Sequence, residues 1–246
     1  MDSIVQSEQR PFFWSFSALE SFEQCPKQFY HTRIAKDFTQ PESEQQRWGK
    51  QVHEAFAKSV DHSPPLPPEM AKWEPWVKFA KEPFDPLTTM RKAEMKLAIT
   101  EQLNPCEYFD KRVPVWFRAV ADVLKISGPF ARILDWKTGN SKCYLDDATN
   151  TWKTDSEQLH LTAAAVMVHY PLVQYVKMDF VWLKEDFWTT DLISRPELPQ
   201  LWQRILPRVN KMKLAHATGI YEPKPSGLCK RHCPVKSCQY HGKGSF

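Results

Sequence analysis

Two aspartates in the middle of the chain have the type and spacing to bind a metal ion. Two predicted strands, 115–126 and 131–138, are joined by a turn containing Gly128-Pro129. If the turn is centred on that bond, residues equally distant from it face each other across the antiparallel pair. Asp122 would then lie opposite Asp135, with Cβ atoms about 5 Å apart.

Two carboxylates opposite each other in an apolar face need a cation between them. Like charges repel, and a face that also carries Leu124 and Ile133 raises the cost of burying them. Lys137 lies two residues after Asp135, on the same face, and supplies one positive charge. A divalent ion would supply the rest, and oxygen ligands suit Mg²⁺ or Mn²⁺. The alternative is a buried Asp–Lys salt bridge with the second aspartate exposed at a bulge.

Three cysteines in the C-terminal tail form a second group that could bind metal. Cys229, Cys233 and Cys238 lie in an irregular segment, 223–246. Three thiolates need a fourth ligand for a tetrahedral zinc ion or a four-iron cluster. For zinc, His232 or His241 could serve, and reduced thiols without a metal are the alternative. Cys106 and Cys143 have no partners in sequence and are expected to be ordinary small residues.

The elements expected to position these groups are helices before and after a set of strands. A capping-box pattern at Ser17–Glu20 opens the first helix, and a proline-rich connector, 63–68, follows the second. This order predicts an α/β or α+β domain. The expected helices cover 17–34, 42–60, 69–81, a segment from a cap at Thr154 or Asp155 to about 170, and 196–215; the expected strands cover 92–100, 115–126, 131–138 and 173–183.

The composition is that of a globular protein long enough for one large domain. The 246 residues are 42% hydrophobic and 25% charged. The net charge of +4 is compatible with a nucleic-acid partner but carries little weight by itself. The polar segment 1–10 does not resemble a signal peptide, and the most apolar helical stretch, 161–168, is too short to cross a bilayer. We therefore expect a cytoplasmic protein that does not enter a membrane.

The segment Ile133-Leu-Asp-Trp-Lys-Thr-Gly139, with Asp122 upstream, resembles the core of the PD-(D/E)xK nuclease superfamily. The resemblance is to its RecB-like branch, which includes AddB-type and CRISPR-associated exonuclease-like proteins, and it covers residues 15 to about 241. The other matching segments, in order, are Ser15–Tyr30, Gly49–His53, Ala93–Leu97 and Gln158 in the following helix. Two positions depart from the family pattern, Ala119-Val-Ala121 in place of Gly-Arg-Ile and Thr162 in place of a tyrosine. Neither change removes a metal ligand.

The resemblance implies a restriction-endonuclease-like fold, a mixed central sheet flanked by helices, in one nuclease domain spanning residues 1–246. Its expected parts are a helical region (15–90), the catalytic sheet and helix (91–185) and a C-terminal helix with the cysteine tail (196–246). By resemblance, the divalent metal is bound by His53, Asp122, Asp135 and the backbone carbonyl of Trp136. Lys137 orients or deprotonates the attacking water, Glu94 is an outer ligand, and Gln158 positions Lys137 or the phosphate.

The resemblance also suggests a fourth ligand for the cysteine group. Cys25-Pro26 is similar to the first cysteine of the iron–sulfur members of the branch, in which a [4Fe–4S] cluster joins the two ends of the chain. The last three cysteines are separated by three and then four residues, where the family usually has two and then five. Zn²⁺ therefore remains the alternative to iron and sulfur.

The expected function is metal-dependent hydrolysis of DNA by an exonuclease or a single-strand-preferring endonuclease. The partner would be DNA with single-stranded ends, together with a helicase or a recombination or CRISPR protein. Two further classes remain open: a non-catalytic DNA- or partner-binding module that keeps the fold, and a redox sensor that uses the cysteine cluster. Candidate DNA contacts are a Trp73/Trp76 stripe, which the buried face of a helix would also explain, and basic residues of the tail, Lys224, Lys230, Arg231 and Lys236.

Overall fold

The computed structural model describes residues 11–39, 41–147 and 150–244. The segment 1–10, in which we expect no signal peptide, lies outside the described residues. The chain divides into two compact units: unit 1 takes its residues from 1–38, 98–118 and 206–246, and unit 2 from 39–97 and 119–205. Among the described residues, no helix has the length and apolar character to cross a membrane.

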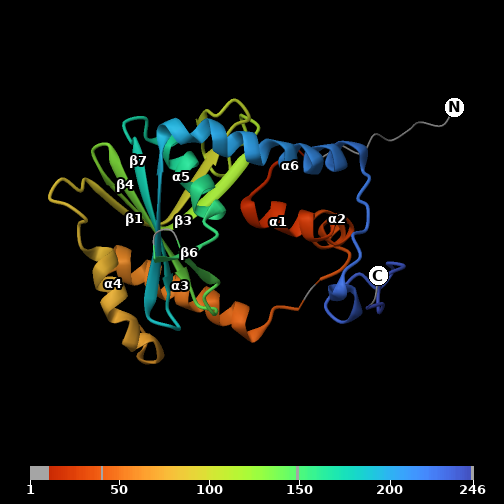
Figure 1. The fold of residues 1–246 in the computed structure, drawn as a ribbon, viewed down its shortest axis with the longest axis horizontal. Coiled ribbons are helices and arrows are strands. Elements are labelled where there is room, and N and C mark those ends of the chain that lie inside the picture. Colours follow the sequence, from red (N-terminus) through yellow and green to blue (C-terminus); the bar gives the residue numbers. More distant parts are fainter. Residues whose placement is uncertain (1–10, 40, 148–149, 245–246) are drawn as a thin grey trace. The chain divides into compact units, whose positions relative to one another are not determined.

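A six-stranded mixed sheet is the central element, with the strand order β2-β1-β3-β4-β7-β8 (Figure 1). Strand β4 pairs antiparallel with β3 and parallel with β7, and β7 pairs antiparallel with β8. The parallel pair is joined through α5 (Glu157–His169), as parallel neighbours require a crossover connection. This architecture confirms the expected mixed sheet flanked by helices. The strands are β1 (Met90–Ile99), β2 (Pro105–Cys106), β3 (Phe117–Ser127), β4 (Phe130–Lys137), β7 (Tyr175–Trp182) and β8 (Phe187–Ser194).

The register of β3 against β4 is the one predicted from the turn. Ser127 pairs with Phe130, and the pairing continues through Val123 and Leu134. Gly128 has a φ of +51°, a left-handed conformation that a glycine adopts at little cost in such a tight turn. The pairs run from Ser127 and Phe130 to Val123 and Leu134, so Asp122 and Asp135 lie one step beyond the last of these pairs. At that step the Asp122 carboxylate accepts the backbone N–H of Trp136.

Two helices of unit 2 cover one face of the sheet. Helix α3 (Glu44–His62) begins with a capping box between Ser43 and Gln46, and α4 (Glu74–Lys81) follows a 3₁₀ turn, Pro68–Trp73. The helix expected over 69–81 is thus two elements, because Pro75 fits the first turn of a new helix. The core on this face joins the helices to the sheet through Val52, Phe56, Trp73, Val77, Val123, Leu134, Trp136 and Val181.

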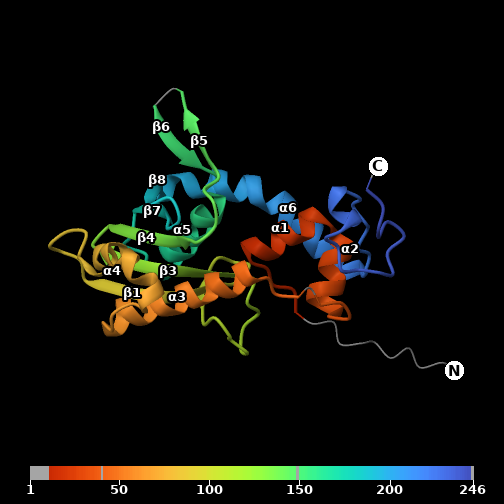
Figure 2. The same cartoon turned by 90° about the horizontal axis from the view of Figure 1, so that it is seen from below.

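The Trp73/Trp76 stripe belongs to this packing. Trp73 is buried, and its indole N–H donates to the backbone carbonyl of Leu183 at 2.8 Å. The packing of Trp73 favours the second interpretation of the Trp73/Trp76 stripe, as the buried face of a helix rather than a surface that contacts DNA. Helix α5 lies on the opposite face of the sheet (Figure 2). Lys137 of β4 donates a hydrogen bond to Gln158 of this helix.

Unit 1 contains the N-terminal helices and the C-terminal part of the chain. Helix α1 (Phe16–Gln24) is capped by Ser15, whose hydroxyl accepts from the N–H of Ala18, so the cap predicted at Ser17 is wrong. The single helix expected over 17–34 is also wrong. Cys25 is extended before Pro26, and a short helix, α2 (Pro26–Phe29), and a π-helical turn (Tyr30–Ala35) continue the chain. Helix α6 runs over Leu198–Thr218, and its residues from Leu206 onward belong to unit 1.

Two features of unit 2 lie outside the elements expected from the sequence. One is the edge strand β8. The other is a separate hairpin of β5 (Cys143–Asp146) and β6 (Thr151–Thr154), located between β4 and α5. Helix α5 itself begins at Glu157 after Ser156, a residue or two later than the cap expected at Thr154 or Asp155.

Candidate active site

The end of β4 places Asp135 and Lys137 on one face. The Lys137 ammonium forms an ion pair with the Asp135 carboxylate and donates to its Oδ2 at 3.2 Å. It also donates to Oε1 of Gln158, 3.3 Å away on α5, and lies 4.9 Å from the centre of the Phe180 ring. Lys137 is thereby fixed by groups from β4, α5 and β7.

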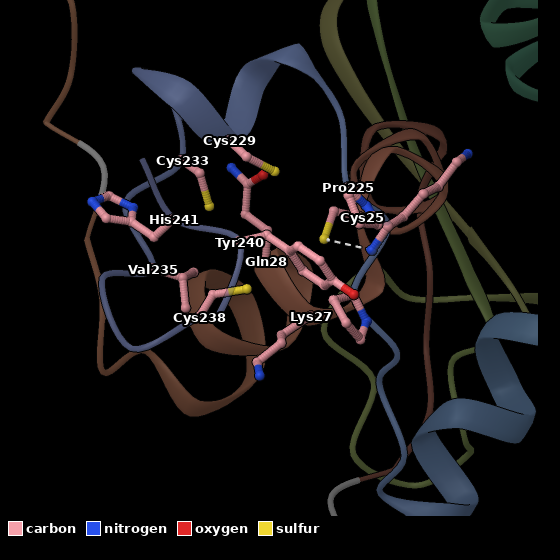
Figure 3. A pocket seen from close by; sticks show the side chains of 12 residues that line it. Cys25, Lys27, Gln28, Pro225, Cys229, Cys233, Val235, Cys238, Tyr240 and His241 are labelled. Carbon is pink, nitrogen blue, oxygen red and sulfur yellow. Dashed lines mark hydrogen bonds between the residues drawn. The ribbon is translucent and has the colours of Figure 1, made fainter. Parts of the chain in front are cut away.

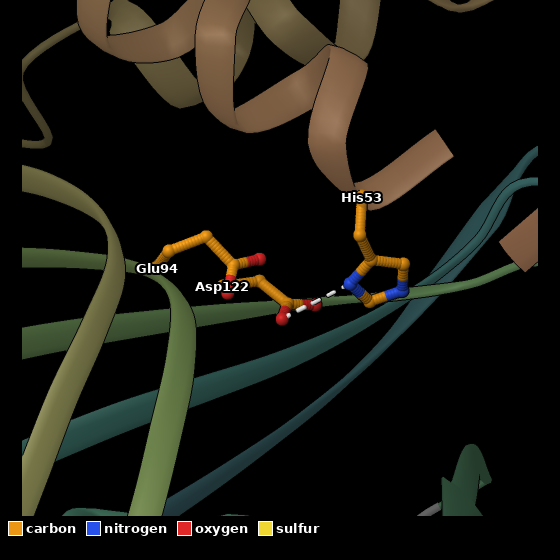
Figure 4. Close-up of side chains that lie close together, drawn as sticks. All are labelled: His53, Glu94 and Asp122. Atoms are coloured by element: carbon orange, nitrogen blue, oxygen red, sulfur yellow. Dashed lines mark ion pairs between the residues drawn. The ribbon is translucent and has the colours of Figure 1, made fainter. Parts of the chain in front are cut away.

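Asp122 connects β3 to both β4 and α3. Its Oδ2 accepts the backbone N–H of Trp136 at 2.8 Å, so this side chain continues the pairing of the two strands. Its Oδ1 lies 3.2 Å from Nδ1 of His53, which α3 directs toward the sheet (Figure 4).

Both ring nitrogens of His53 face oxygen acceptors. Nδ1 faces Asp122, and Nε2 lies 3.0 Å from the carbonyl oxygen of Trp136. A neutral imidazole has one N–H, so it can satisfy only one of these two contacts. Burial opposes a charge on the ring, but the hydrogen bond and charge of Asp122, with the charges of Asp135 and Glu94, raise the pKa of His53 to about 9. The surroundings of this ring therefore favour a positive charge, either a proton or a metal ion.

Glu94 completes a group of three possible metal ligands. One ligand atom each of His53, Glu94 and Asp122 lie within 4.8 Å of one another (Figure 4). Burial, and next the charge of Asp122, raise the pKa of the Glu94 carboxyl. Its φ of +47° lies in the left-handed region, which is unusual for a glutamate inside a strand and characteristic of strained functional positions.

Asp135 lies near these three residues but does not belong to the group whose ligand atoms all lie within 4.8 Å of one another. Burial raises the pKa of its carboxyl, the ion pair with Lys137 lowers it, and the charge of Asp122 raises it further; the net direction is upward. Its Oδ1 is buried and forms the ion pair with the Lys137 ammonium. A buried carboxylate next to a histidine and two further carboxylates fits a hard divalent cation.

The four cysteines of the sequence analysis surround one pocket in unit 1. Cys25, Cys229, Cys233 and Cys238 all line it, together with Tyr240 and His241 (Figure 3). Burial raises the pKa of the Cys233 thiol, a backbone hydrogen bond with Val235 lowers it, and the other three cysteines raise it further; the net direction is upward. The Sγ of Cys25 accepts the backbone N–H of Lys224 at 3.4 Å, and that of Cys229 accepts from Ser226 at 3.5 Å.

One contact of this site could not be found from sequence motifs. Phe180 of β7 lies under the Lys137 ammonium and pairs in parallel register with Asp135. The register of these strands pairs residues 45 positions apart, as Asp135 with Phe180. It depends on the crossover through α5, which no local pattern specifies. From the sequence, Phe180 could be recognised only as an aromatic residue in an apolar predicted strand, 173–183.

Comparisons with known proteins show the family and the fold of the chain. A sequence model of the PD-(D/E)XK nuclease superfamily matches residues 13–238. The chain belongs to this superfamily of nucleases. Its fold is similar to the crystal structure of a candidate exonuclease from Eubacterium rectale, with a TM-score of 0.52 and 11% identity over 93% of this chain and 91% of that chain. No curated protein sequence matches the chain.

Proposed function

We propose that the chain is a metal-dependent deoxyribonuclease whose divalent ion is bound by His53, Glu94, Asp122 and Asp135. The observation that carries this proposal is His53, whose two nitrogens face oxygen acceptors beside the carboxylates of Glu94 and Asp122. The carbonyl oxygen of Trp136, 3.0 Å from His53, is a further candidate ligand. Mg²⁺ or Mn²⁺ fits this donor set, in which three of the four side chains offer oxygen.

The bound ion and two side chains would have distinct roles in the hydrolysis of a phosphodiester. The bound ion would lower the pKa of a water molecule and offset charge on the phosphate. Lys137, oriented by Asp135 and Gln158, would hold that water and stabilise the developing negative charge. Gln158 has a second role as a candidate phosphate contact, because its amide N–H₂ group remains a donor while Oε1 accepts from Lys137.

A nuclease assay with matched variants tests this function. We expect the wild type to degrade DNA with Mg²⁺ or Mn²⁺ and to be inactive in EDTA. Asp135→Ala and Lys137→Ala should each lower the rate at least about 100-fold, the scale at which a positioned acid–base or electrostatic group contributes. Lys177→Ala, which removes an exposed lysine from β7, is the control and should keep the rate. Equal rates for all four proteins, or no cleavage by any of them, would reject the proposal.

The substrate and partners belong to the same proposal. We propose DNA with single-stranded ends as the substrate, in the manner of the RecB-like branch that the ordered motifs resemble. A helicase or a recombination or CRISPR protein would supply such ends. A digest of end-labelled single strands distinguishes an exonuclease, which releases mononucleotides or short products from one end, from an endonuclease, which also cuts circular single strands.

We also propose that the cysteine pocket holds a structural [4Fe–4S] cluster. Bonds of about 2.3 Å to one zinc ion would place tetrahedral thiolates about 3.8 Å apart. Among the described residues, no three cysteines have Sγ atoms within 4.8 Å of one another. Four cysteines spread around one pocket suit a larger group better than a single ion.

Metal analysis tests the cluster independently of activity. We expect a brown purified protein with about four iron atoms per chain, the content of one cubane cluster. Cys25→Ser should lose the iron, whereas Cys106→Ser, which changes a cysteine outside the pocket, should keep it. Stoichiometric zinc without iron or labile sulfide would reject the iron–sulfur proposal in favour of the zinc alternative.

A further inference from the structure

The chain between Lys137 and Gln158 leaves the candidate active site and returns to it as a hairpin. Strands β5 and β6 form their own two-stranded sheet, separate from the six-stranded one. The hydrogen bond from Lys137 to Gln158 closes the base of this excursion. Figure 2 shows the two strands extending away from the central sheet. Whatever binds at the candidate site is therefore at the base of the hairpin.

Large apolar side chains of the hairpin are exposed on both of its faces. Tyr144 is 57% exposed and Trp152 is 56% exposed. Leu145, also exposed, pairs across the strands with Trp152 and shares its face, whereas Tyr144 pairs with Lys153 on the other face. Each face thus presents one aromatic ring to solvent.

The base of the hairpin is fixed while these rings remain exposed. The N–H of Ser141 donates to Oε1 of Glu185 at 3.1 Å, and Thr154 Oγ1 donates to the carbonyl of Lys142 at 3.1 Å. Two-stranded hairpins are only marginally stable in water, and rings that are more than half exposed add little to their stability. Binding of an external ligand therefore explains the exposure of Tyr144 and Trp152 better than packing within the chain does.

We propose that the β5–β6 hairpin binds unpaired nucleotides of the substrate strand by stacking bases on Tyr144 and Trp152. This inference rests on the proposed function, because the substrate strand is what reaches the base of the hairpin. Aromatic rings suit single-stranded DNA of any sequence, since every nucleobase has a π face. Lys142, where the hairpin begins, adds a positive charge for the phosphates of the DNA. Paired bases are stacked within the duplex and offer these rings no free face.

Binding to dye-labelled oligo(dT) and to a blunt duplex tests the proposal. Anisotropy is measured in EDTA, so that no strand is cleaved. We expect Tyr144→Ala and Trp152→Ala each to weaken binding of oligo(dT) by about fivefold or more, the loss of one stacked base, and to change duplex binding less than twofold. Phe130→Ala is the matched control, because Phe130 is a similarly exposed ring at the opposite end of β4 and should leave both affinities unchanged.

The outcomes separate this proposal from the proposed function. A wild type that cleaves DNA while the hairpin variants bind oligo(dT) as tightly as it does would overturn the hairpin's role and keep the nuclease. A wild type that binds oligo(dT) through the two rings but never cleaves DNA would reject the nuclease function and keep the hairpin as a nucleotide-binding element. If the wild type fails to bind oligo(dT), or if Trp152→Ala instead abolishes self-association of the chain, the hairpin is not a nucleotide-binding element.

Discussion

At the scale of single residues, Glu94 shows how the site departs from what stability alone would select. Its left-handed backbone costs about 1–3 kcal/mol for a residue that is not glycine. Its carboxyl is also partly desolvated beside Asp122, which adds to the cost. Such a position persists when the surrounding structure determines it, and here it places a carboxylate next to His53.

Two substitutions separate the strain at Glu94 from its charge. Glu94→Asn removes the charge and places a residue that tolerates left-handed backbone, so we expect stability to rise by about 1 kcal/mol. Glu94→Gln removes the same charge but keeps a side chain that the conformation disfavours, so its gain should be smaller. Both should weaken Mn²⁺ binding at least about tenfold. Urea denaturation and calorimetric titration measure the two effects. Equal stabilities of the two variants would show that the backbone is not strained.

Lys125 carries a predicted pH dependence of stability. It is 1% exposed, and its ammonium donates to the carbonyls of Phe79 and Glu82 at 2.8 and 2.7 Å. Burial, and next the charges of Arg132 and Arg91, lower its pKa from 10.5 to about 8. Below pH 8 the group is charged in both the folded and the unfolded chain, and the full cost of burying the charge is present. Between pH 8 and 10.5 only the unfolded chain keeps the proton, so stability rises with pH.

Lys125→Met removes this proton and isolates its effect. The neutral amine of the wild type still has two N–H groups for the two carbonyls, whereas the methionine has none. We therefore expect the wild type to gain about 2 kcal/mol over the variant between pH 7 and pH 10. Urea denaturation of both proteins at the two pH values measures the gap. A gap that does not change with pH contradicts the low pKa.

At the scale of elements, a buried ion pair links the three strands β4, β7 and β8. The Nε of Arg132 donates to Oδ2 of Asp179 at 2.6 Å, and Thr190 Oγ1 donates to Oδ1 at 2.6 Å. Asp179 is fully buried, and the Arg132 guanidinium lies 4.6 Å from the centre of the Phe79 ring. Removing one partner would leave the other charge uncompensated in the interior.

Asp179→Ala should therefore destabilise the protein by about 3–5 kcal/mol, the cost of breaking a buried pair. Replacing both partners, as Arg132→Met with Asp179→Leu, should recover most of that loss, because no uncompensated charge remains. Glu101→Ala, which breaks an exposed pair with Lys213, is the control and should cost less than about 1 kcal/mol. Thermal and urea denaturation compare the variants; a double variant as unstable as Asp179→Ala would show that packing, rather than charge, dominates.

The elements also show what the sequence could and could not predict. The β3–β4 register followed from one turn, because its geometry determines every pair beyond it. Strand β8 was not predicted because its burial does not follow the hydrophobicity of its residues. Thr189 and Ile193 are buried, whereas Trp188 and Leu192 are exposed. The helix expected over 17–34 failed at Pro26, where the preceding residue must be extended.

The candidate site divides in the same way. The placement of Lys137 beside Asp135 follows from their spacing along one strand. His53, Glu94 and Gln158 come from three other elements, and only resemblance to a family pointed to them before the structure brought them near this strand. The twisted backbone of Glu94 has no sequence signature, since glutamate rarely adopts it.

At the scale of the whole molecule, each proposed metal group lies within one unit. All four cysteines belong to unit 1, whereas His53, Glu94, Asp122 and Asp135 belong to unit 2. We therefore expect Cys233→Ser to lose iron but keep Mn²⁺ binding, and His53→Ala to lose Mn²⁺ binding but keep iron. Iron analysis and calorimetry measure both. Loss of both metals in either variant would mean that the two groups depend on each other for folding.

The two units are interleaved along the chain, and we propose that they behave as one domain. The chain passes between them four times, near residues 38, 97, 118 and 205. Neither unit is a continuous segment, so neither can be separated from the other by a single cut. We expect one cooperative urea transition, with fluorescence and circular dichroism curves that coincide. Two separated transitions would show that the units unfold independently.

The salt bridge between Arg208 and Glu23 has a consequence for how the protein is made. Its two distances, 2.6 and 2.7 Å, join residues 185 positions apart, and Cys25 shares its pocket with cysteines that are synthesised still later. Because protein synthesis adds about 5–20 residues per second, roughly 10–40 seconds pass between the synthesis of helix α1 and that of these partners. During that interval its apolar face, with Leu19 and Phe22, is available to chaperones and proteases. We therefore expect nascent chains to be cleaved by proteases more readily than completed chains.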